Sequence, residues 1–433
     1  MTISRRTALQ LAASAALAPA AQQAHAADVT LNVWTGYPEL VPWYQAAGEA
    51  YTKAKGTKLN VFSTTLREHE QKLSAAMPTG TGPDLFDVGL ILSVTLIEAG
   101  LIKPNPAPLD QQLKSGAYNP ASNDQFTMEG KTYGLPLLFS TPAMFWNKAM
   151  FQQAGIAGPP NTFPELMDDA KKLTVTDSSG KMTRSGISLR LSGQGSGIAE
   201  KFRFVLEPAG GSLIVPAGRG KFHQGYDNQA GRDALQFYID AVQVEHVDDP
   251  RVQHDSDAFV AGNTAMLFRE AWVIGEIQKK NPSLQYDVYP IPAWKAGGKR
   301  KTLLQHDGIY VSAKSKNYDA ANDFLLFATN KEWSFKLTEM TGWVAARRDI
   351  DWAPLLAKIP QYKTFLDMPK DVEYYPEPLL SCWNEIESRL ADGLPGAYVD
   401  PSLKTDPKKV ADTIHKFAMQ TDQILKDSDL YGA

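Results

Sequence analysis

Strand-like and helix-like segments alternate over residues 29–100, and this alternation constrains the fold more than any other feature of the chain. Residues 29–34 ("VTLNVW") and 58–62 ("KLNVF") have the β-branched, alternating composition of strands, and a third strand follows "PTGTGPD". A helical pattern follows each of them. Strands that alternate with helices predict an α/β domain built on an open, mostly parallel sheet. Ligands bind such sheets at the carboxyl ends of the strands, so a crevice is expected near residues 34–39 and after Leu85.

A long apolar run is interrupted in the middle of the sequence. Residues 135–146 ("LPLLFSTPAMFW") have the composition of a buried strand, but Pro136 and Pro142 break it. The run is therefore expected to form a strand that stops and then resumes. Asn147 stands where a helix cap is expected, and Gly155 stands where that helix ends. A chain that leaves one hydrophobic core and enters another would have this pattern.

The length of the chain also favours two cores. A chain of 433 residues is longer than a single hydrophobic core usually organises, so two lobes are expected. From Asp349 to the end the pattern is helical, with turns at proline, and residues 296–301 have the composition of a solvated loop. Further strands are expected at residues 186–191, 264–268, 286–292 and 306–312.

The N-terminus has the composition of an export signal. Residues 1–26 combine a basic start with an Ala-rich apolar stretch and end in a small-x-small cleavage site, "AHA". The "SRRTALQ" segment resembles a twin-arginine signal, while the general secretory route stays open because Ala8 and Gln10 depart from that motif. No cysteine stands directly after the cleavage site, and no other apolar run reaches the roughly 18–20 residues of a membrane span. We expect a free periplasmic protein that begins at Ala27.

Composition and spacing argue against several classes of function. The net charge of −4 argues against binding nucleic acid or an anionic membrane. Cys382 is the only cysteine, so no intrachain disulfide is possible, and the seven histidines show no metal-ligand spacing. Neither a nucleophile elbow nor an H-E-x-x-H motif is present. Pairs such as Asp84/Asp87 and Glu385/Glu387 could serve a glycosidase, but caps and helix faces explain them, so an enzyme is not expected.

Several segments together resemble one family, the extracellular solute-binding proteins of bacterial ABC importers of the carbohydrate type, to which the maltose-binding protein belongs. They follow the family's order over nearly all of the chain after the signal, and residues 130–174 are the most specific. The segments are "LNVWTG" (31–36), "GTGPDLFDV" (80–88), residues 130–174, "FVAGNTAMLFREAW" (259–272), "VYPIPAW" (288–294), "AKSKNYDAANDFLLFAT" (313–329) and "TGWVAARRD" (341–349).

The resemblance implies a type II periplasmic-binding-protein fold, with two α/β lobes of mostly parallel sheets flanked by helices and a ligand cleft between the lobes. It also implies a monomeric receptor without a cofactor, which closes on its solute by hinge motion and delivers it to membrane permease subunits. The implied lobes are residues 27–139 with 304–345 (N-terminal) and 140–303 with 346–433 (C-terminal). The implied crossings between the lobes are residues 140–142, 301–305 and 345–350.

The resemblance further implies where the solute binds. A sugar site needs flat aromatic faces, together with planar polar groups that satisfy hydroxyls. Trp272 matches a position at which the family stacks a sugar ring. Trp383 matches a second aromatic position, although tryptophan at helical spacing is usually core. The candidate ligand-binding residues are Trp34, Gly36, Tyr37, Glu39, Asp87, Ser140, Glu270, Trp272, His306, Asp307, Trp343, Arg347 and Trp383.

Structural explanations remain open for several of these candidates. Glu39 could favour the N-terminus of the helix that follows it, and Asp87 could cap a loop. Glu270 could form an exposed pair with Arg269. Arg347 would suit an acidic group on the ligand through its bidentate fork, or it could lie on the surface.

The sequence does not name the solute. Residues 91–93 ("ILS") and Ser140 depart from the polar and acidic residues of maltose binders, so maltose-like specificity is not implied. A sugar or polyol is the main expectation, and a phosphorylated polyol such as glycerol 3-phosphate is an alternative. The adjacent Tyr374 and Tyr375 leave a ferric-iron receptor of the same fold as a further alternative.

Overall fold

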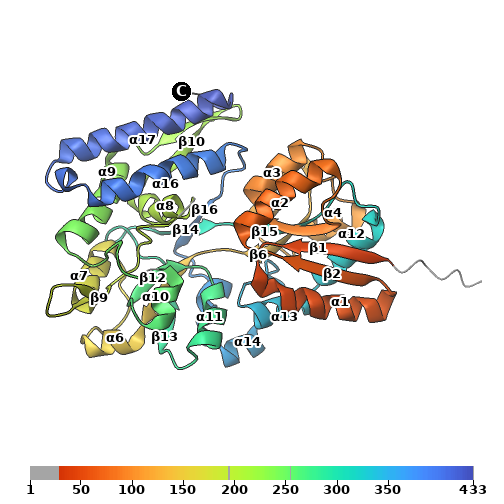
Figure 1. Ribbon diagram of the computed structural model, residues 1–433, viewed down its shortest axis with the longest axis horizontal. Helices are drawn as coiled ribbons and strands as arrows, with labels where there is room; N and C mark the ends of the chain where they lie inside the picture. Colours follow the sequence, from red (N-terminus) through yellow and green to blue (C-terminus); the bar gives the residue numbers. More distant parts are fainter. Residues whose placement is uncertain (1–28, 194–195, 254, 433) are drawn as a thin grey trace, which may run out of the picture.

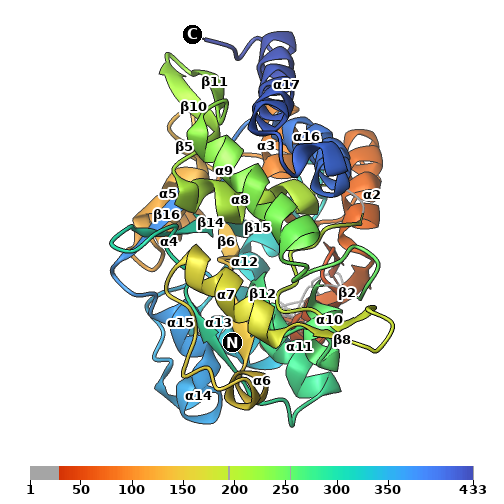
Figure 2. The ribbon, with the colours of Figure 1, turned by 90° about the vertical axis from the view of Figure 1, so that its left-hand side faces the viewer.

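The computed structural model describes residues 29–193, 196–253 and 255–432. The export signal expected at residues 1–26 lies outside the described residues. Figure 1 shows the chain as two masses side by side, one formed mainly by the red and orange N-terminal elements and the other mainly by the yellow, green and dark blue elements. Figure 2 views the second mass face on.

The first mass contains a five-stranded sheet. Its strand order is β2 (Lys58–Ser63), β1 (Thr30–Thr35), β3 (Leu85–Gly89), β15 (His306–Val311) and β6 (Leu135–Phe139). β1 is parallel to β2 and β3, whereas β15 is antiparallel to β3 and β6. Four strands therefore run in one direction, as the alternation of strands and helices predicts. At the carboxyl end of β3, Gly89 pairs with Asp307 at the start of β15.

Helices pack around this sheet and complete its core. Trp43 of the first helix is fully buried and donates its indole N–H to the carbonyl of Trp333 at 2.8 Å. Core residues come from 31 to 138 and again from 309 to 346, so a distant part of the chain completes this core. The helices are α1 (Val41–Lys55), α2 (Leu66–Thr79), α3 (Leu90–Glu98), α4 (Ala107–Lys114), α5 (Pro120–Gln125), α12 (Tyr318–Ala328) and α13 (Lys331–Thr341).

The interrupted apolar run has the structure that the sequence predicts. β6 and β7 (Ala143–Asn147) are separated by a break at residues 140–142. Asn147 caps α6 (Lys148–Gln153) by accepting a hydrogen bond from the backbone N–H of Met150 at 3.0 Å. β6 packs in the first core, whereas β7 packs in the cores of the second mass. The run therefore carries the chain from one core into another.

The sheet of the second mass departs from the mostly parallel arrangement that was expected. Its order is β12 (Met266–Arg269), β7 and β13 (Tyr286–Tyr289), and β7 is antiparallel to both neighbours. β12 and β13 run in the same direction and are joined through the helix α11 (Trp272–Lys280). β7 arrives from the first lobe and lies between them.

The strand expected at residues 186–191 does not form. Isolated bridges, one of them at Ser188, connect this segment to the region of β12. The backbone N–H of Leu189 donates to Oδ2 of Asp248 at 2.8 Å instead of to a neighbouring strand. Arg190 then adopts a left-handed conformation with φ of 54°, which ends the extended backbone.

Two strands that pair with each other over a long sequence separation were missed. β14 (Arg300–Leu304) pairs in parallel with β16 (Val372–Pro376). The expected loop at 296–301 is therefore wrong for its last two residues, and the purely helical pattern after Asp349 is wrong at β16. Each strand is stabilised by a partner far away in the sequence, which local composition does not report.

The remaining elements complete the second mass and several short hairpins. α8 packs against both α9 and α16, and α16 packs against α17. The elements are η1 (Pro38–Leu40), β4 (Thr127–Met128), β5 (Lys131–Thr132), α7 (Phe163–Leu173), β8 (Val175–Thr176), β9 (Met182–Arg184), α8 (Gly197–Ala209), β10 (Ser212–Gly218), β11 (Lys221–Gly225), α9 (Gln229–Ile239), the π-helical turn η2 (Asp240–Val244), α10 (Asp255–Ala261), α14 (Ala353–Lys358), η3 (Pro360–Tyr362), α15 (Lys363–Leu366), α16 (Trp383–Val399), η4 (Pro401–Leu403) and α17 (Pro407–Asp427).

Hydrogen bonds join the chain segments that run between the two masses. Ser140, in the break after β6, donates its backbone N–H to the carbonyl of Gln305 at 2.9 Å. Phe139 donates its backbone N–H to the carbonyl of Val344 at 2.8 Å. The first and second segments predicted to cross between lobes therefore lie against each other, and the third begins beside the end of β6.

Replacing Gly80 by alanine is expected to lower the free energy of unfolding by about 1–2 kcal/mol. Gly80 ends α2 with φ of 75°, in the left-handed region that disfavours a Cβ atom. The matched control is Gly396→Ala inside α16, where an added Cβ meets nothing within 4 Å. There alanine should add up to about 1 kcal/mol, because it loses less backbone freedom on folding. Urea unfolding of both variants measures the difference, and equal effects would contradict the conformational argument.

Candidate ligand-binding cleft

A cavity of about 1020 Å³ lies between the two masses. Its first wall includes Tyr37, the polar face of α2 with Arg67, Glu70 and Gln71, and Asp307 at the start of β15. Its second wall includes Arg190, Glu200, Arg269, Glu377, Asn384 and Glu387. Carboxyl, guanidinium, amide and phenol groups from both masses therefore surround one space.

Asp307 lies at the base of the cavity in a nearly dry environment. Its carboxyl accepts hydrogen bonds from the Tyr37 hydroxyl at 2.8 Å and from the Ser140 hydroxyl at 3.0 Å. Burial raises the pKa of Asp307 to about 6. The pKa of Tyr37 is also raised, first by burial and then by the charge of Asp307. Asp307 thus links the loop after β1 to the first crossing segment.

Three aromatic rings continue from this base toward the second mass. The rings of Tyr37 and Trp343 lie 5.2 Å apart, and those of Trp343 and Trp272 lie 6.2 Å apart. The indole N–H of Trp272 donates to Glu270 at 3.0 Å, and the guanidinium of Arg269 lies 5.3 Å from the Trp272 ring. Six predicted residues (Tyr37, Ser140, Glu270, Trp272, Asp307 and Trp343) therefore form one connected group of contacts.

A network of charges lies beside the aromatic rings. Arg269 forms a bidentate pair with Asp255 and also contacts Glu270 at 3.3 Å. Lys201 contacts Glu270 at 3.3 Å. Burial alone would raise the pKa of Glu270, but Lys201 and Arg269 lower it to about 2. The surface pair considered from the sequence is therefore a buried, ionised network.

A second charged cluster supports the wall that α16 and β16 provide. Arg203 is 2% exposed and donates to Glu377 at 2.8 Å and to Glu387 at 3.0 Å. The indole N–H of Trp383 donates to Glu377. Trp383 is only 1% exposed and packs in the core behind the wall. It is therefore a core residue and does not face the ligand.

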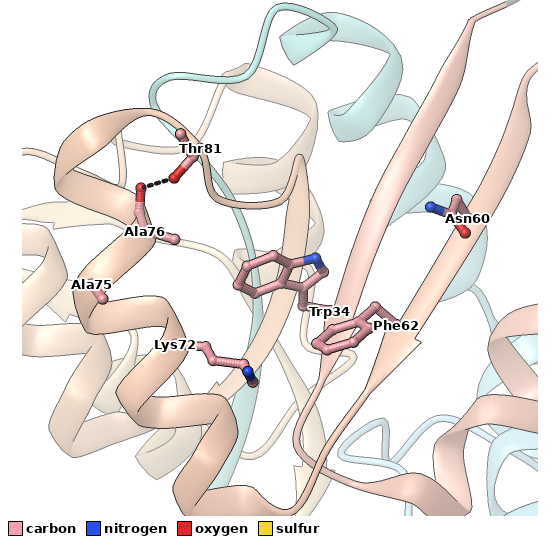
Figure 3. A pocket seen from close by; sticks show the side chains of 7 residues that line it. All are labelled: Trp34, Asn60, Phe62, Lys72, Ala75, Ala76 and Thr81. Atoms are coloured by element: carbon pink, nitrogen blue, oxygen red, sulfur yellow. Dashed lines mark hydrogen bonds between the residues drawn. The ribbon is translucent and has the colours of Figure 1, made fainter.

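Trp34 lies in a different pocket from the cavity. A shallow, mostly apolar pocket of about 550 Å³ is formed by Trp34, Asn60, Phe62, Lys72, Ala75, Ala76 and Thr81. Figure 3 shows the Trp34 and Phe62 rings on the two strands, with Lys72 reaching from α2. The two rings are 5.5 Å apart. Ala75 of α2 lines both this pocket and the cavity, so the helix lies between the two.

Gly36, Glu39 and Asp87 do not line the cavity either. The backbone N–H of Gly36 donates to Asp87 at 3.2 Å, and the Tyr44 hydroxyl donates to Asp87 at 2.8 Å. Asp87 is fully buried, and its role is to fix the loop after β1. Glu39 is half-buried in η1, at the start of the helical segment, where a carboxylate favours the helix N-terminus.

His306 and Arg347 are engaged elsewhere in the first mass. His306 is fully buried, with its two ring nitrogens bonded to Ser122 and Gln125, and burial lowers its pKa to about 3. The side-chain alternation of β15 sends His306 away from the side of Asp307. Arg347 binds Asp349 through two nitrogens, at 2.8 and 2.9 Å, so its fork is already occupied.

Sequence analysis missed most of the cavity wall. On α2 a signal existed, because Arg67, Glu70 and Gln71 recur at helical spacing on a polar face beside the buried side of the helix. Glu387 was noticed only as half of a carboxylate pair. Arg190, in a loop, and Glu200, in the first turn of α8, offered no local signal.

No group of His, Cys, Asp and Glu that could hold a metal ion is found among the described residues. Tyr374 and Tyr375 are neighbours on β16, so their side chains leave opposite faces of the strand. Tyr374 lies 6.2 Å from the Phe139 ring, whereas Tyr375 lies 5.4 Å from the guanidinium of Arg203. The two hydroxyls are therefore not arranged to share one iron.

Comparisons with known proteins agree on the class of protein. The model of the family described as bacterial extracellular solute-binding protein matches residues 46–364. A putative binding protein of Brucella abortus is 24% identical over 416 residues, covering 94% of this chain and 95% of that protein. The galactooligosaccharide-binding protein of Bacillus subtilis is 24% identical, covering 86% and 87%. An ABC transporter solute-binding protein of Thermotoga lettingae, solved bound with α-D-tagatose, superposes with a TM-score of 0.76 at 22% identity, covering 92% of this chain and 100% of that chain.

Since the family model covers most of the chain, this protein belongs to the bacterial extracellular solute-binding proteins. It is a binding protein and not an enzyme. Its two α/β masses have the type II fold of that group, which confirms the resemblance found in the sequence. Across the described ranges, none of the helices combines the length and apolarity needed to cross a bilayer.

Proposed function

We propose that this protein is the periplasmic receptor of an ABC importer and captures a sugar or polyol. The observation that carries the proposal is the cavity of about 1020 Å³, whose walls come from both lobes and present both hydrogen-bond donors and acceptors. A solute rich in hydroxyls loses water on entry and needs such groups in return. The galactooligosaccharide and tagatose binders among the relatives support a solute of this kind.

We assign the direct contacts to residues at the base and walls of the cavity. Tyr37 and Asp307 line it, and Glu270 orients Trp272 beside it. The half-buried ring of Trp272 would stack on the solute when the lobes approach each other. Trp343 supports that ring from behind. Trp383 would act through Glu377, which it contacts.

We propose that solute binding closes the lobes about the crossing segments. The proposed lobes are residues 27–139 with 304–345 and residues 140–303 with 346–433. The distribution of the first core between residues 31–138 and 309–346 supports this division. A solute that contacts both walls binds the closed state better than the open one, and this difference in affinity drives closure. The closed form would then dock, as an exported monomer, on the permease subunits.

No specific observation favours the alternative solutes. Arg347 suggested an acidic group on the ligand, but Asp349 occupies its fork. The iron alternative needs two tyrosines that β16 directs to opposite sides. A sugar or polyol therefore remains the proposed solute.

A thermal-shift screen of the protein from Ala27 tests the proposal. The probes are D-glucose, D-tagatose, L-arabinose, raffinose, maltotriose, sorbitol and glycerol, with glycerol 3-phosphate and ferric citrate as the alternatives. A neutral compound at a hundred times its dissociation constant should add about 2.7 kcal/mol of stability, which is readily seen as a higher midpoint. A response to ferric citrate or glycerol 3-phosphate alone would contradict the proposed solute class.

Two variants locate the solute and test closure. Gln71 lies on the first wall and Asn384 on the second, and both are exposed. If the solute bridges the lobes, Gln71→Ala and Asn384→Ala should each weaken binding of the responding compound. Gln420→Ala, an exposed glutamine on α17 outside the cavity, is the matched control. Loss of affinity in only one of the two cavity variants would contradict closure around the solute.

A further inference from the structure

Two carboxyl groups that were assigned no direct contact with the solute face the cavity from the second lobe. Glu377 follows the end of β16, and Glu387 lies on α16. Both side chains line the cavity, although each residue is only 4% exposed. Buried carboxyl groups at the wall of a cavity are costly to keep unless they have partners, so their arrangement calls for a physical reason.

Arg203 holds the two carboxyl groups in place from behind. One of its terminal nitrogens, Nη1, donates to Glu377 at 2.8 Å and to Glu387 at 3.0 Å. The guanidinium plane is fixed by the ring of Trp383, 4.8 Å away, and by the ring of Tyr375, 5.4 Å away. Arg203 and Trp383 are therefore positioning residues, because they do not line the cavity themselves.

The cluster leaves hydrogen-bonding capacity directed at the cavity. Arg203 binds Oε1 of Glu387, and within the described part of the chain Oε2 of Glu387 has no hydrogen-bond partner. Burial, followed by the charge of Glu377, raises the pKa of Glu387 well above its usual range. Oε2 of Glu387 can therefore accept a hydrogen bond from the solute. A hydroxyl group, which can donate to this oxygen, is its chemical complement.

The charges around the cavity oppose an anion. Five carboxyl groups and three guanidinium groups line it. Two of the guanidiniums, Arg190 and Arg269, already pair with Asp255 behind the wall. Arg203 is shared between two carboxyls and is buried behind them, outside the cavity lining, so it is not accessible to a phosphate or carboxylate of the solute. An anionic group near this cluster would meet carboxyl oxygens instead of free cations.

We propose that Glu377 and Glu387, positioned by Arg203 and Trp383, form a subsite for adjacent hydroxyls of a neutral sugar or polyol and exclude anionic derivatives. The inference rests on the proposed function, because it places that solute in the same cavity. It adds a subsite on the second lobe that binds hydroxyls of the solute. It also specifies that the solute is neutral. The subsite is inferred only from residues of this chain that come together at the second wall of the cavity.

Variants at Glu387 test the subsite with matched controls. Calorimetric titration with the neutral compounds of the screen is expected to show about tenfold weaker binding for Glu387→Leu, which keeps the volume and removes the polar atoms. Glu387→Gln keeps one donor and one acceptor group and should restore binding to within about threefold of the parent. Glu385→Leu, on the same helix but 57% exposed and outside the cavity, should bind as the parent does.

The unmodified protein gives a second measurement that does not depend on folding of a variant. D-Glucuronate and glucose 6-phosphate should bind at least about tenfold more weakly than D-glucose, and glycerol 3-phosphate more weakly than glycerol. Equal or tighter binding of the anions would overturn the exclusion. Unchanged binding of a neutral compound by Glu387→Leu would overturn the subsite and leave the proposed function standing. If no neutral compound binds the unmodified protein, the proposed function fails and the subsite fails with it.

Discussion

Replacing Arg203 by methionine is expected to lower the free energy of unfolding by about 3–5 kcal/mol at neutral pH. Arg203 is 2% exposed and is the cation that Glu377 and Glu387 share. Methionine occupies a similar volume, so the loss comes from charge and not from a cavity. The two carboxyls would remain buried without a counter-charge, and leaving a buried charge unpaired costs more than the ion pair itself contributes.

The dependence of this loss on pH distinguishes charge from packing. Unpaired buried carboxyls take up protons as the pH falls, and a neutral carboxyl is less costly to bury. The destabilisation should therefore be smaller at pH 5 than at pH 8, measured by urea unfolding at both values. Arg389→Met is the matched control, because Arg389 is 64% exposed and its contact with Glu385 is 3.9 Å long. It should change stability by no more than about 0.5 kcal/mol. A loss for Arg203→Met that is equal at both pH values would contradict the electrostatic cause.

The fold could be predicted from the sequence wherever a segment carries its own pattern. Strand and helix alternate from β1 to α3 with the expected periodicities, and the broken run over β6 and β7 has proline at the break and asparagine at the cap. The segment at 186–191 has strand composition, but the N–H groups of Gly186 and Leu189 bond to Val247 and Asp248, while that of Ser188 bonds to Met266. β16 forms because β14 lies beside it, and the pairing of residues some seventy positions apart is a tertiary effect.

The candidate site could be predicted only where it depends on the ends of strands. Tyr37 follows β1, and Asp307 lies at the start of the antiparallel strand β15. Sheet topology therefore brings both to the carboxyl ends of β1 and β3. The second wall depends on helix packing, and Glu387 faces the cavity while Trp383, one turn earlier, faces the core. The family resemblance suggested Trp383 as a ligand contact, with a core position as the alternative. The structure instead directs its indole N–H to Glu377, so the residue reaches the cavity only through its neighbour.

Asp87→Asn is expected to change how the stability of the protein depends on pH. Asp87 is fully buried and accepts hydrogen bonds from Tyr44 and from the backbone N–H of Gly36. Burial raises its pKa to about 7, although those hydrogen bonds oppose the shift. The unfolded chain has the ordinary value of about 4. Between these two values the folded protein therefore holds one proton that the unfolded chain has released.

The sign of the effect follows from this difference in bound protons. The contribution of Asp87 to stability is fully present below pH 4 and is lost as the pH rises toward 7, because the slope of stability with pH is negative where the folded state binds more protons. Each unit of pKa shift corresponds to about 1.4 kcal/mol, so the loss across this window is on the order of 4 kcal/mol. Asparagine does not titrate and removes that part of the slope.

Urea unfolding of the parent and of Asp87→Asn at pH 4, 5, 6, 7 and 8 measures the difference directly. The variant should gain stability relative to the parent as the pH rises, and the difference should level off above about pH 7. Part of the parent's slope should remain, because Asp307 also has a raised pKa, of about 6. Asp257→Asn, on a side chain that is 69% exposed, is the control and should run nearly parallel to the parent above pH 5. Parallel curves for Asp87→Asn would mean that Asp87 is ionised in the folded protein throughout, so the loop after β1 would rest on a buried carboxylate held by its hydrogen bonds alone.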